Sequence, residues 1–245
     1  MQRRTHVMFN RTALGEVSPV FPIDFVISAE IGSKSQMCKL VAPRTRVFLH
    51  DFPRSSEFLL QDGCIALYQS LYDGRRQILD ILGPGSFLGL SIGSSVNCCA
   101  ETLAFTQIQP VAQLTDHALG SALKHMLRRS QALVTLLGRK TAQEKVAFAL
   151  LDLAERFTLT SKASQLRKTT FRLFLTRADL ADWLGLTLET VSRCLNSFKR
   201  SGILTFNHPE IITIADENAL RCLASGQPSL AGQKSAKGDV SLQPS

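Results

Sequence analysis

The chain has 245 residues, 44% of them hydrophobic, with a formal net charge of +8 and an isoelectric point near 9.4. Its apolar runs are far shorter than the roughly 20 residues of a membrane-spanning helix, and no apolar signal segment follows the basic start Met1–Arg4. We therefore expect a cytoplasmic protein with no membrane partner. The positive charge favours a polyanion such as nucleic acid, with a merely solvated basic surface as the alternative.

Residues 1–40 show no clear period, and we expect them to form an N-terminal arm. Residues 41–114 contain short apolar segments separated by turn signals such as Asp62-Gly63 and Pro84-Gly85. Many short strands at regular spacing predict a small β-barrel or jelly roll here. The strand candidates are Cys64–Ser70, Gln77–Leu82, Ser86–Leu90, Glu101–Phe105 and Gln107–Val111.

Residues 115–139 change to a helical period. Apolar residues recur every four and three positions over nearly three heptads, with Ser130 as the polar exception. This seam predicts a dimerisation helix, and a helix packed on its own barrel is the alternative. The expected dimer-interface residues are Leu119, Leu123, Met126, Ser130, Leu133 and Leu137.

Two short helical patterns separated by a tight turn follow further along. Thr176 and Asp179 have the spacing of a capping box at the start of the first helix, and Gly185 suits its end. Thr187 can cap the second helix, Leu188–Ser201. A helix, a three-residue turn with Gly and a second helix form the DNA-binding helix-turn-helix arrangement.

A hairpin pattern follows the second helix. Gly202–Phe206 and Ile211–Ile214 read as two strands around a polar turn, which would form a wing. Residues 161–204 contain eight Lys/Arg and three Asp/Glu, a formal charge of +5. Together these features predict a winged helix-turn-helix domain over residues 140–224 with double-stranded DNA as its partner. Residues 225–245 are rich in Ser, Gly, Gln and Pro, and we expect a disordered tail.

The second helix carries polar side chains of the types that read base edges. A carboxylate can accept a hydrogen bond from cytosine, and a guanidinium can hold guanine O6 and N7. Glu189, Ser192 and Arg193 share one face because their spacings are three and four. We expect them to read bases, while a solvated face with an incidental ion pair is the alternative. The residues expected to contact DNA phosphates are Thr176, Arg177, Thr187, Thr190, Lys199 and Arg200.

Residues 175–193 read L-T-R-A-D-L-A-D-W-L-G-L-T-L-E-T-V-S-R, which resembles the DNA-binding signature of the CRP/FNR superfamily of bacterial transcription regulators. The E-x-x-S-R of the second helix is most similar to the FNR and FixK branches. The resemblance covers about Val41 to Ala224. It implies an α+β fold with a cyclic-nucleotide-binding-like β-barrel, a long dimerisation helix and a C-terminal winged helix-turn-helix domain.

The same resemblance implies a homodimer that reads a palindrome of TTGA-type half-sites. Arg193 and Glu189 would then read a G·C pair, and Ser192 a neighbouring A·T pair. RNA polymerase would be a further partner. FixK-like members activate oxygen-limited or nitrogen-related metabolism, including nitrogen fixation, and that role is an expectation from the resemblance alone.

The residues that serve effectors in this superfamily are missing here. Nucleotide-binding members carry a Gly-Glu pair followed by an Arg, but Leu90 follows Gly89 and no Arg or Lys stands between Gly89 and Glu101. A buried cyclic phosphate without a cation is costly, so we expect no cyclic-AMP binding. The iron–sulfur cluster of the FNR branch needs closely spaced N-terminal cysteines, and the first 60 residues hold only Cys38. We therefore expect no cofactor and no metal.

Cys194 follows Arg193 directly and is a candidate redox switch if its sulfur is accessible. Its position in the pattern is usually an apolar inward one, which is the alternative. No Ser/His/Asp or Cys/His set is suggested, so we expect no catalytic residues and no enzyme. The alternative function is a ligand-, haem- or thiol-gated sensor regulator of the same fold whose DNA binding needs an effector.

Overall fold

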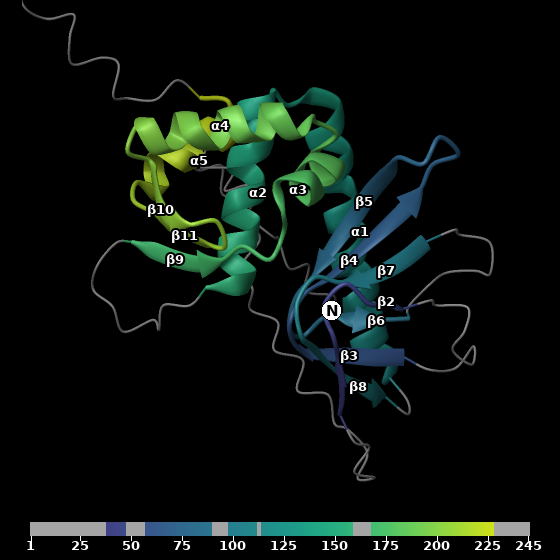
Figure 1. The fold of residues 1–245 in the computed structure, drawn as a ribbon. Coiled ribbons are helices and arrows are strands. Elements are labelled where there is room, and N and C mark those ends of the chain that lie inside the picture. Colours follow the sequence, from purple (N-terminus) through teal and green to yellow (C-terminus); the bar gives the residue numbers. More distant parts are fainter. Residues whose placement is uncertain (1–37, 48–56, 90–97, 112–113, 159–167, 228–245) are drawn as a thin grey trace, which may run out of the picture.

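The computed structural model describes residues 38–47, 57–89, 98–111, 114–158 and 168–227 (Figure 1). The expectations for the arm up to residue 37, for residue 90 beside the barrel turn and for the tail from residue 228 lie outside these residues. Two parts are visible, a strand-rich one and a helix-rich one, which the helices α1 (Asp116–Arg139) and α2 (Ala142–Phe157) connect.

The N-terminal part consists of two four-stranded antiparallel sheets, which confirms the predicted barrel or jelly roll. The strand order is β1-β8-β3-β6 in one sheet and β2-β7-β4-β5 in the other. Apolar side chains such as Leu60, Ile65 and Ile108 form a core with contributions from both sheets. The strands are β1 (Lys39–Val41), β2 (Arg46–Val47), β3 (Glu57–Asp62), β4 (Ile65–Ser70), β5 (Arg76–Leu82), β6 (Phe87–Leu88), β7 (Cys98–Thr102) and β8 (Thr106–Val111).

Several strand boundaries differ from the expectation, most of them by one or two residues. β1 begins at Lys39, so the last residues assigned to the arm pair with β8 instead. The expected strand Glu101–Phe105 is wrong, because the chain leaves β7 after Thr102 and turns before β8. The Leu103 backbone N–H donates to the carbonyl of Cys64 at 2.8 Å within this turn.

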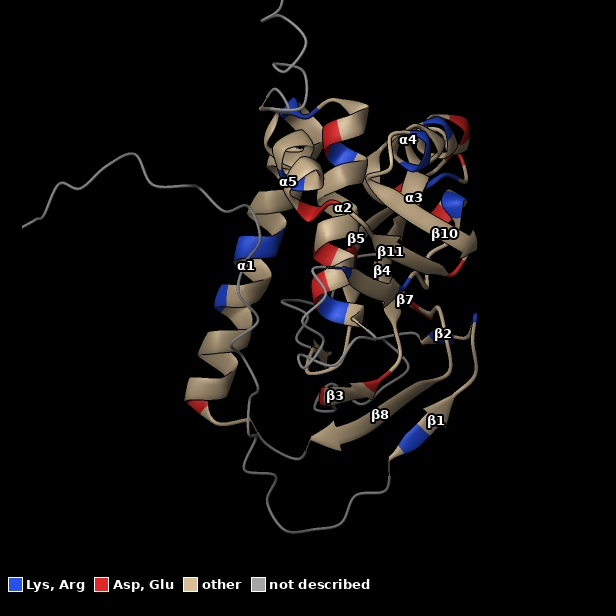
Figure 2. Cartoon of the chain, turned by 90° about the vertical axis from the view of Figure 1, so that its left-hand side faces the viewer, with Lys and Arg blue, Asp and Glu red and all other residues tan. Residues whose placement is uncertain are grey.

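Two helices connect the parts. α1 (Asp116–Arg139) begins at Thr115, whose hydroxyl accepts from the Ala118 N–H at 3.2 Å. α2 (Ala142–Phe157) begins with a capping box formed by Thr141 and Glu144. The chain leaves helical geometry at Lys140, which divides the two. α1 lies along the outside of the molecule (Figure 2).

The C-terminal part packs the two predicted short helices together with α2 and a small sheet. Its elements are β9 (Thr169–Arg172), α3 (Arg177–Leu184), α4 (Leu188–Arg200), β10 (Leu204–His208), β11 (Ile211–Ile214) and α5 (Glu217–Ser225). β10 and β11 form the expected hairpin, and β9 adds a third strand in the order β10-β11-β9. β9 and α5 have no counterpart among the elements predicted from the sequence. α5 packs on α2 and ends one residue beyond the expected domain boundary.

One hydrophobic core runs through both parts. Tyr68 and Ile78 of the barrel, Leu136 of α1, Leu150 of α2 and Phe171 of β9 belong to a single cluster of buried side chains. The helix-rich part therefore shares its core with the outer surface of the β4–β5 sheet.

Gly185 occupies a position that a side chain would strain. It caps α3 in the left-handed region at φ 60°, and an added Cβ would lie 3.3 Å from Leu137 Cδ2. Gly202, after α4, has φ 74° but no atom within 4 Å of such a Cβ, which makes it a matched control. We predict that Gly202→Ala lowers the free energy of unfolding by about 1 kcal/mol and that Gly185→Ala lowers it further. Urea denaturation measures both values. Equal losses would show that the contact with Leu137 adds no cost.

Candidate nucleic-acid interface

The helix-turn-helix forms through local capping. Thr176 and Asp179 make the predicted capping box: the Asp179 N–H donates to Thr176 Oγ1 at 3.1 Å, and the Thr176 N–H donates to Asp179 Oδ2 at 2.9 Å. At the turn, the Leu186 N–H reaches the carbonyl of Ala181 at 3.0 Å. Thr187 then caps α4 by accepting from the Thr190 N–H at 3.1 Å. These bonds determine where α4 begins and how it follows α3.

α4 has a buried apolar face and an exposed polar face. The apolar side chains Val191, Leu195 and Phe198 pack into the shared core. On the opposite side Glu189 and Arg193 have 70% and 76% of their side chains exposed, and they pair at 2.5 Å. An exposed pair of this kind contributes little stability and can open for another partner. Ser192 lies on the same side and is half-buried.

Basic side chains continue this face toward the end of α4. A shallow depression there is lined by Arg193, Asn196, Lys199 and Arg200. Asn196 lies seven residues after Glu189 on the same helix face, a spacing that could have identified it from the sequence. Figure 2 shows basic segments on α4 at this corner of the molecule. The arrangement presents hydrogen-bonding side chains and positive charge on one protruding helix.

Phe206 of the wing connects two of the predicted phosphate-binding cations. Lys199 Nζ lies 4.5 Å from the centroid of its ring, and the Arg177 guanidinium carbon lies 5.7 Å from it. Lys199 Nζ also donates to the Phe206 carbonyl at 2.9 Å. Burial lowers the pKa of Arg177. The sequence gives no signal for this grouping, because its members come from α3, α4 and β10.

Cys194 does not meet the condition for a redox switch. Its side chain lies in the core beneath α4 and is only 6% exposed. Burial raises the pKa of its thiol, which disfavours the reactive thiolate. Cys98 and Cys99 are adjacent in β7, so their side chains point to opposite faces of the sheet.

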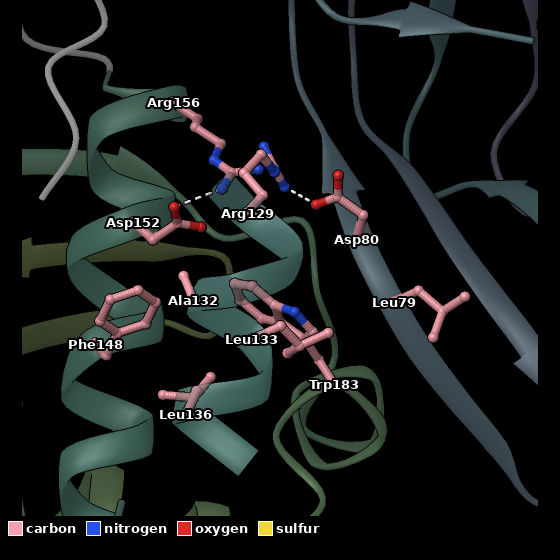
Figure 3. Close-up of a pocket in the computed structure, with 10 residues that line it drawn as sticks. All are labelled: Leu79, Asp80, Arg129, Ala132, Leu133, Leu136, Phe148, Asp152, Arg156 and Trp183. Carbon is pink, nitrogen blue, oxygen red and sulfur yellow. Dashed lines mark hydrogen bonds and ion pairs between the residues drawn. The ribbon is translucent and has the colours of Figure 1, made fainter. Parts of the chain in front are cut away.

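The predicted seam on α1 is partly turned inward. Leu133 is partly buried, packs against the chain's own core and lines a cavity with Leu136 and Trp183 (Figure 3), which favours the alternative of packing within the chain for this residue. The large apolar side chains that α1 exposes are instead Leu127 and Val134, at 59% and 72%. Each lies one position beyond a member of the predicted seam, which is a rotation of about 100° around the helix.

The cavity in Figure 3 lies where β5, α1, α2 and α3 meet. Arg129 pairs with Asp80, and Arg156 pairs with Asp152 at 2.5 Å. Arg129 also donates to the Ile81 carbonyl at 2.7 Å. With a volume near 30 Å³ the cavity holds one or two waters rather than a nucleotide or a haem.

Across the residues that the structure describes, no three His, Cys, Asp or Glu side chains gather at a distance that could hold a metal ion. None of the described helices is long and apolar enough to cross a membrane.

Comparison with known proteins identifies the family. Residues 144–223 match the Crp-like helix-turn-helix domain. The chain is 34% identical to the nitrogen fixation regulation protein FixK of Azorhizobium caulinodans over 75% of its own length and 77% of that protein. It is 34% identical to the transcriptional activator protein FnrL of Cereibacter sphaeroides over 63% of its own length and 66% of that protein. The structure of FixK2 from Bradyrhizobium japonicum superimposes with a TM-score of 0.67 and 31% identity, covering 77% of this chain and 96% of that one. The chain therefore belongs to the CRP/FNR family of DNA-binding transcription regulators, near its FixK branch.

Proposed function

We propose that this regulator acts as a homodimer that reads a palindrome of TTGA-type half-sites with α4. The observation that carries the proposal is the exposed face of α4, where Glu189, Ser192 and Arg193 stand together on a helix anchored by a buried apolar face. A helix of this type fits the major groove, where a guanidinium distinguishes guanine and a carboxylate distinguishes cytosine.

The groups around α4 suit phosphate contacts. Thr176, Thr187 and Thr190 stand at helix starts, where hydroxyl groups and backbone N–H groups favour anions. Arg177, Lys199 and Arg200 add positive charge beside them. We assign the packing of Arg177 and Lys199 on Phe206 the role of holding both cations toward the DNA backbone. Such contacts set register and do not read sequence.

Dimerisation is proposed through the exposed side of α1. Leu127 and Val134 lie three or four positions from Leu123, Ser130 and Leu137 of the predicted seam, so these residues share one face of α1. The opposite face of the helix packs on the barrel. Two such helices related by a two-fold axis would place two α4 helices on one palindrome. The revised seam is Gly120, Leu123, Leu127, Ser130, Val134 and Leu137.

The pathway and the effector are proposed from the relatives. A similar protein is named for the regulation of nitrogen fixation, and another is named a transcriptional activator. We propose an activator of oxygen-limited or nitrogen-related genes that acts with RNA polymerase and binds DNA without cyclic AMP. The gated-sensor alternative makes the opposite prediction, since untreated protein would then not prefer the palindrome to a scrambled duplex.

Arg193→Ala tests base reading. We predict a loss of about 1–3 kcal/mol in binding free energy at the palindrome and little change on the scrambled duplex, because only the base contact is removed. Fluorescence anisotropy at fixed salt measures both affinities. Arg200→Ala is the matched control and should weaken both duplexes alike. Equal losses on both duplexes for Arg193→Ala would assign Arg193 to the phosphates.

Phe206→Leu tests the support of the cations. Without the aromatic ring Lys199 and Arg177 lose a shared partner, so binding to both duplexes should weaken. The slope of log K against log salt should become shallower by about one, the value of one lost phosphate contact. Phe206→Tyr keeps the ring and should keep the slope. A wild-type slope in Phe206→Leu would contradict the role of the ring.

Val134→Glu tests the revised seam. A carboxylate within this apolar two-fold contact would face its own copy, and the dimer should dissociate at micromolar concentration. Analytical ultracentrifugation reports the mass. Thr135→Glu adds the same charge about 100° away on the helix and should remain dimeric. A dimer that survives Val134→Glu but not Met126→Glu would restore the original seam.

A further inference from the structure

A buried carboxylate connects the DNA-binding part to the barrel. The Asp179 side chain is fully buried and, besides capping α3, accepts hydrogen bonds from two barrel arginines. Arg44 Nη2 donates to Asp179 Oδ2 at 2.9 Å, and Arg76 Nη2 donates to Oδ1. Burial alone would raise the pKa of Asp179, but the hydrogen bonds from Arg44 and Thr176 outweigh it and hold the pKa below its usual value.

Arg76 is the centre of this contact. From β5 its Nε donates to Asp182 Oδ2 at 2.5 Å, and its Nη1 reaches Glu101 Oε2 at 3.4 Å. The guanidinium also packs over the Tyr68 ring at 5.6 Å. Every nitrogen of the Arg76 guanidinium therefore has a carboxylate partner, and two of these partners lie one turn apart on α3.

Arg44 approaches the same carboxylate from a second direction. It lies in the turn between β1 and β2 with φ 58°, a conformation that is uncommon for a residue with a side chain. Its backbone N–H donates to the Thr102 carbonyl at 2.7 Å, and its Nη1 donates to Glu101 Oε1 at 3.2 Å. The turn is thus anchored to β7 while its side chain holds α3.

The other end of α3 is anchored as well. Gln77 of β5 donates from Nε2 to the Trp183 carbonyl at 3.2 Å, and the Trp183 side chain is buried. α3 lies beside β5 (Figure 1). Because the capped turn connects α3 directly to α4, a barrel that holds both ends of α3 also determines the direction of α4.

We propose that Arg76, with Arg44, Glu101, Asp179 and Asp182, forms an interdomain latch that sets the spacing between the two half-sites a dimer can read. This inference rests on the proposed function. In such a dimer the position of each α4 relative to the two-fold axis depends on how its own DNA-binding domain packs on the barrel. One added base pair moves a half-site by about 3.4 Å and rotates it by about 34°. Arg76 is thus a positioning residue that does not touch DNA.

The test is a spacer series. Palindromes with the natural spacer and with one or two base pairs added or removed are titrated with wild type, Arg76→Gln and Asp182→Asn. Wild type should lose at least about tenfold in affinity on each altered spacer, the size of one lost base-pair contact. With the latch opened, α3 can tilt, so each variant should bind the palindrome with the natural spacer more weakly than wild type does. Its affinity for the altered palindromes should then be less than about threefold below its own affinity for the natural one.

Arg75→Gln is the matched control. The Arg75 side chain is 76% exposed and, among the described residues, pairs only with Asp73 of its own turn at 2.6 Å, so its variant should keep the wild-type penalty. Asp182→Asn is the second latch variant in case Arg76→Gln does not fold. Asp182 is partly exposed, and its substitution leaves the ion pairs of Asp179 in place. If the latch variants fold and lose as much affinity on the altered spacers as wild type does, the latch is overturned and the proposed function stands. Wild type without preference for any palindrome would overturn the proposed function and the latch with it.

Discussion

The neutralisation of the buried Asp179 carboxylate is the constraint on which the relation between the two parts of the molecule depends. A carboxylate removed from water is stable only where donors surround it, and here the donors come from the helix it caps and from two strands or turns of the barrel. The same side chain therefore begins α3 and fixes where α3 lies. Neither task can be altered without disturbing the other.

Apolar packing supports the same arrangement. The outer surface of the β4–β5 sheet, α1, α2 and the winged domain share one cluster of buried side chains, while the space between the two sheets has its own. The core of the helix-rich part thus extends onto the barrel rather than ending at the boundary between strands and helices. A change in the barrel reaches the DNA-binding helices through packed side chains as well as through ion pairs.

The local features of the interface could be predicted from the sequence, whereas its long-range contacts could not. The capping box of Thr176 and Asp179, the turn at Gly185 and the polar face of α4 follow from residues within one or two turns of each other. The partners of Asp179 stand 103 and 135 positions away, and no local pattern names them.

The seam on α1 shows a different limit. Two apolar stripes share Leu123, Ser130 and Leu137, and sequence periodicity cannot choose between them. Packing within the chain favours the stripe of Leu127 and Val134, since it partly buries Leu133. The inward position of Cys194 was foreseeable, because it is three residues from Val191 and four from Phe198, both of which face the core.

The ion pair between Glu189 and Arg193 affects how charge is distributed over the proposed DNA-binding surface. The two side chains carry opposite formal charges, so the pair proposed to read sequence adds no net charge to the protein. Long-range attraction to DNA must then come from neighbours such as Lys199 and Arg200. Under the proposed function, different side chains carry the strength and the selectivity of DNA binding, so substitutions that change one can leave the other in place.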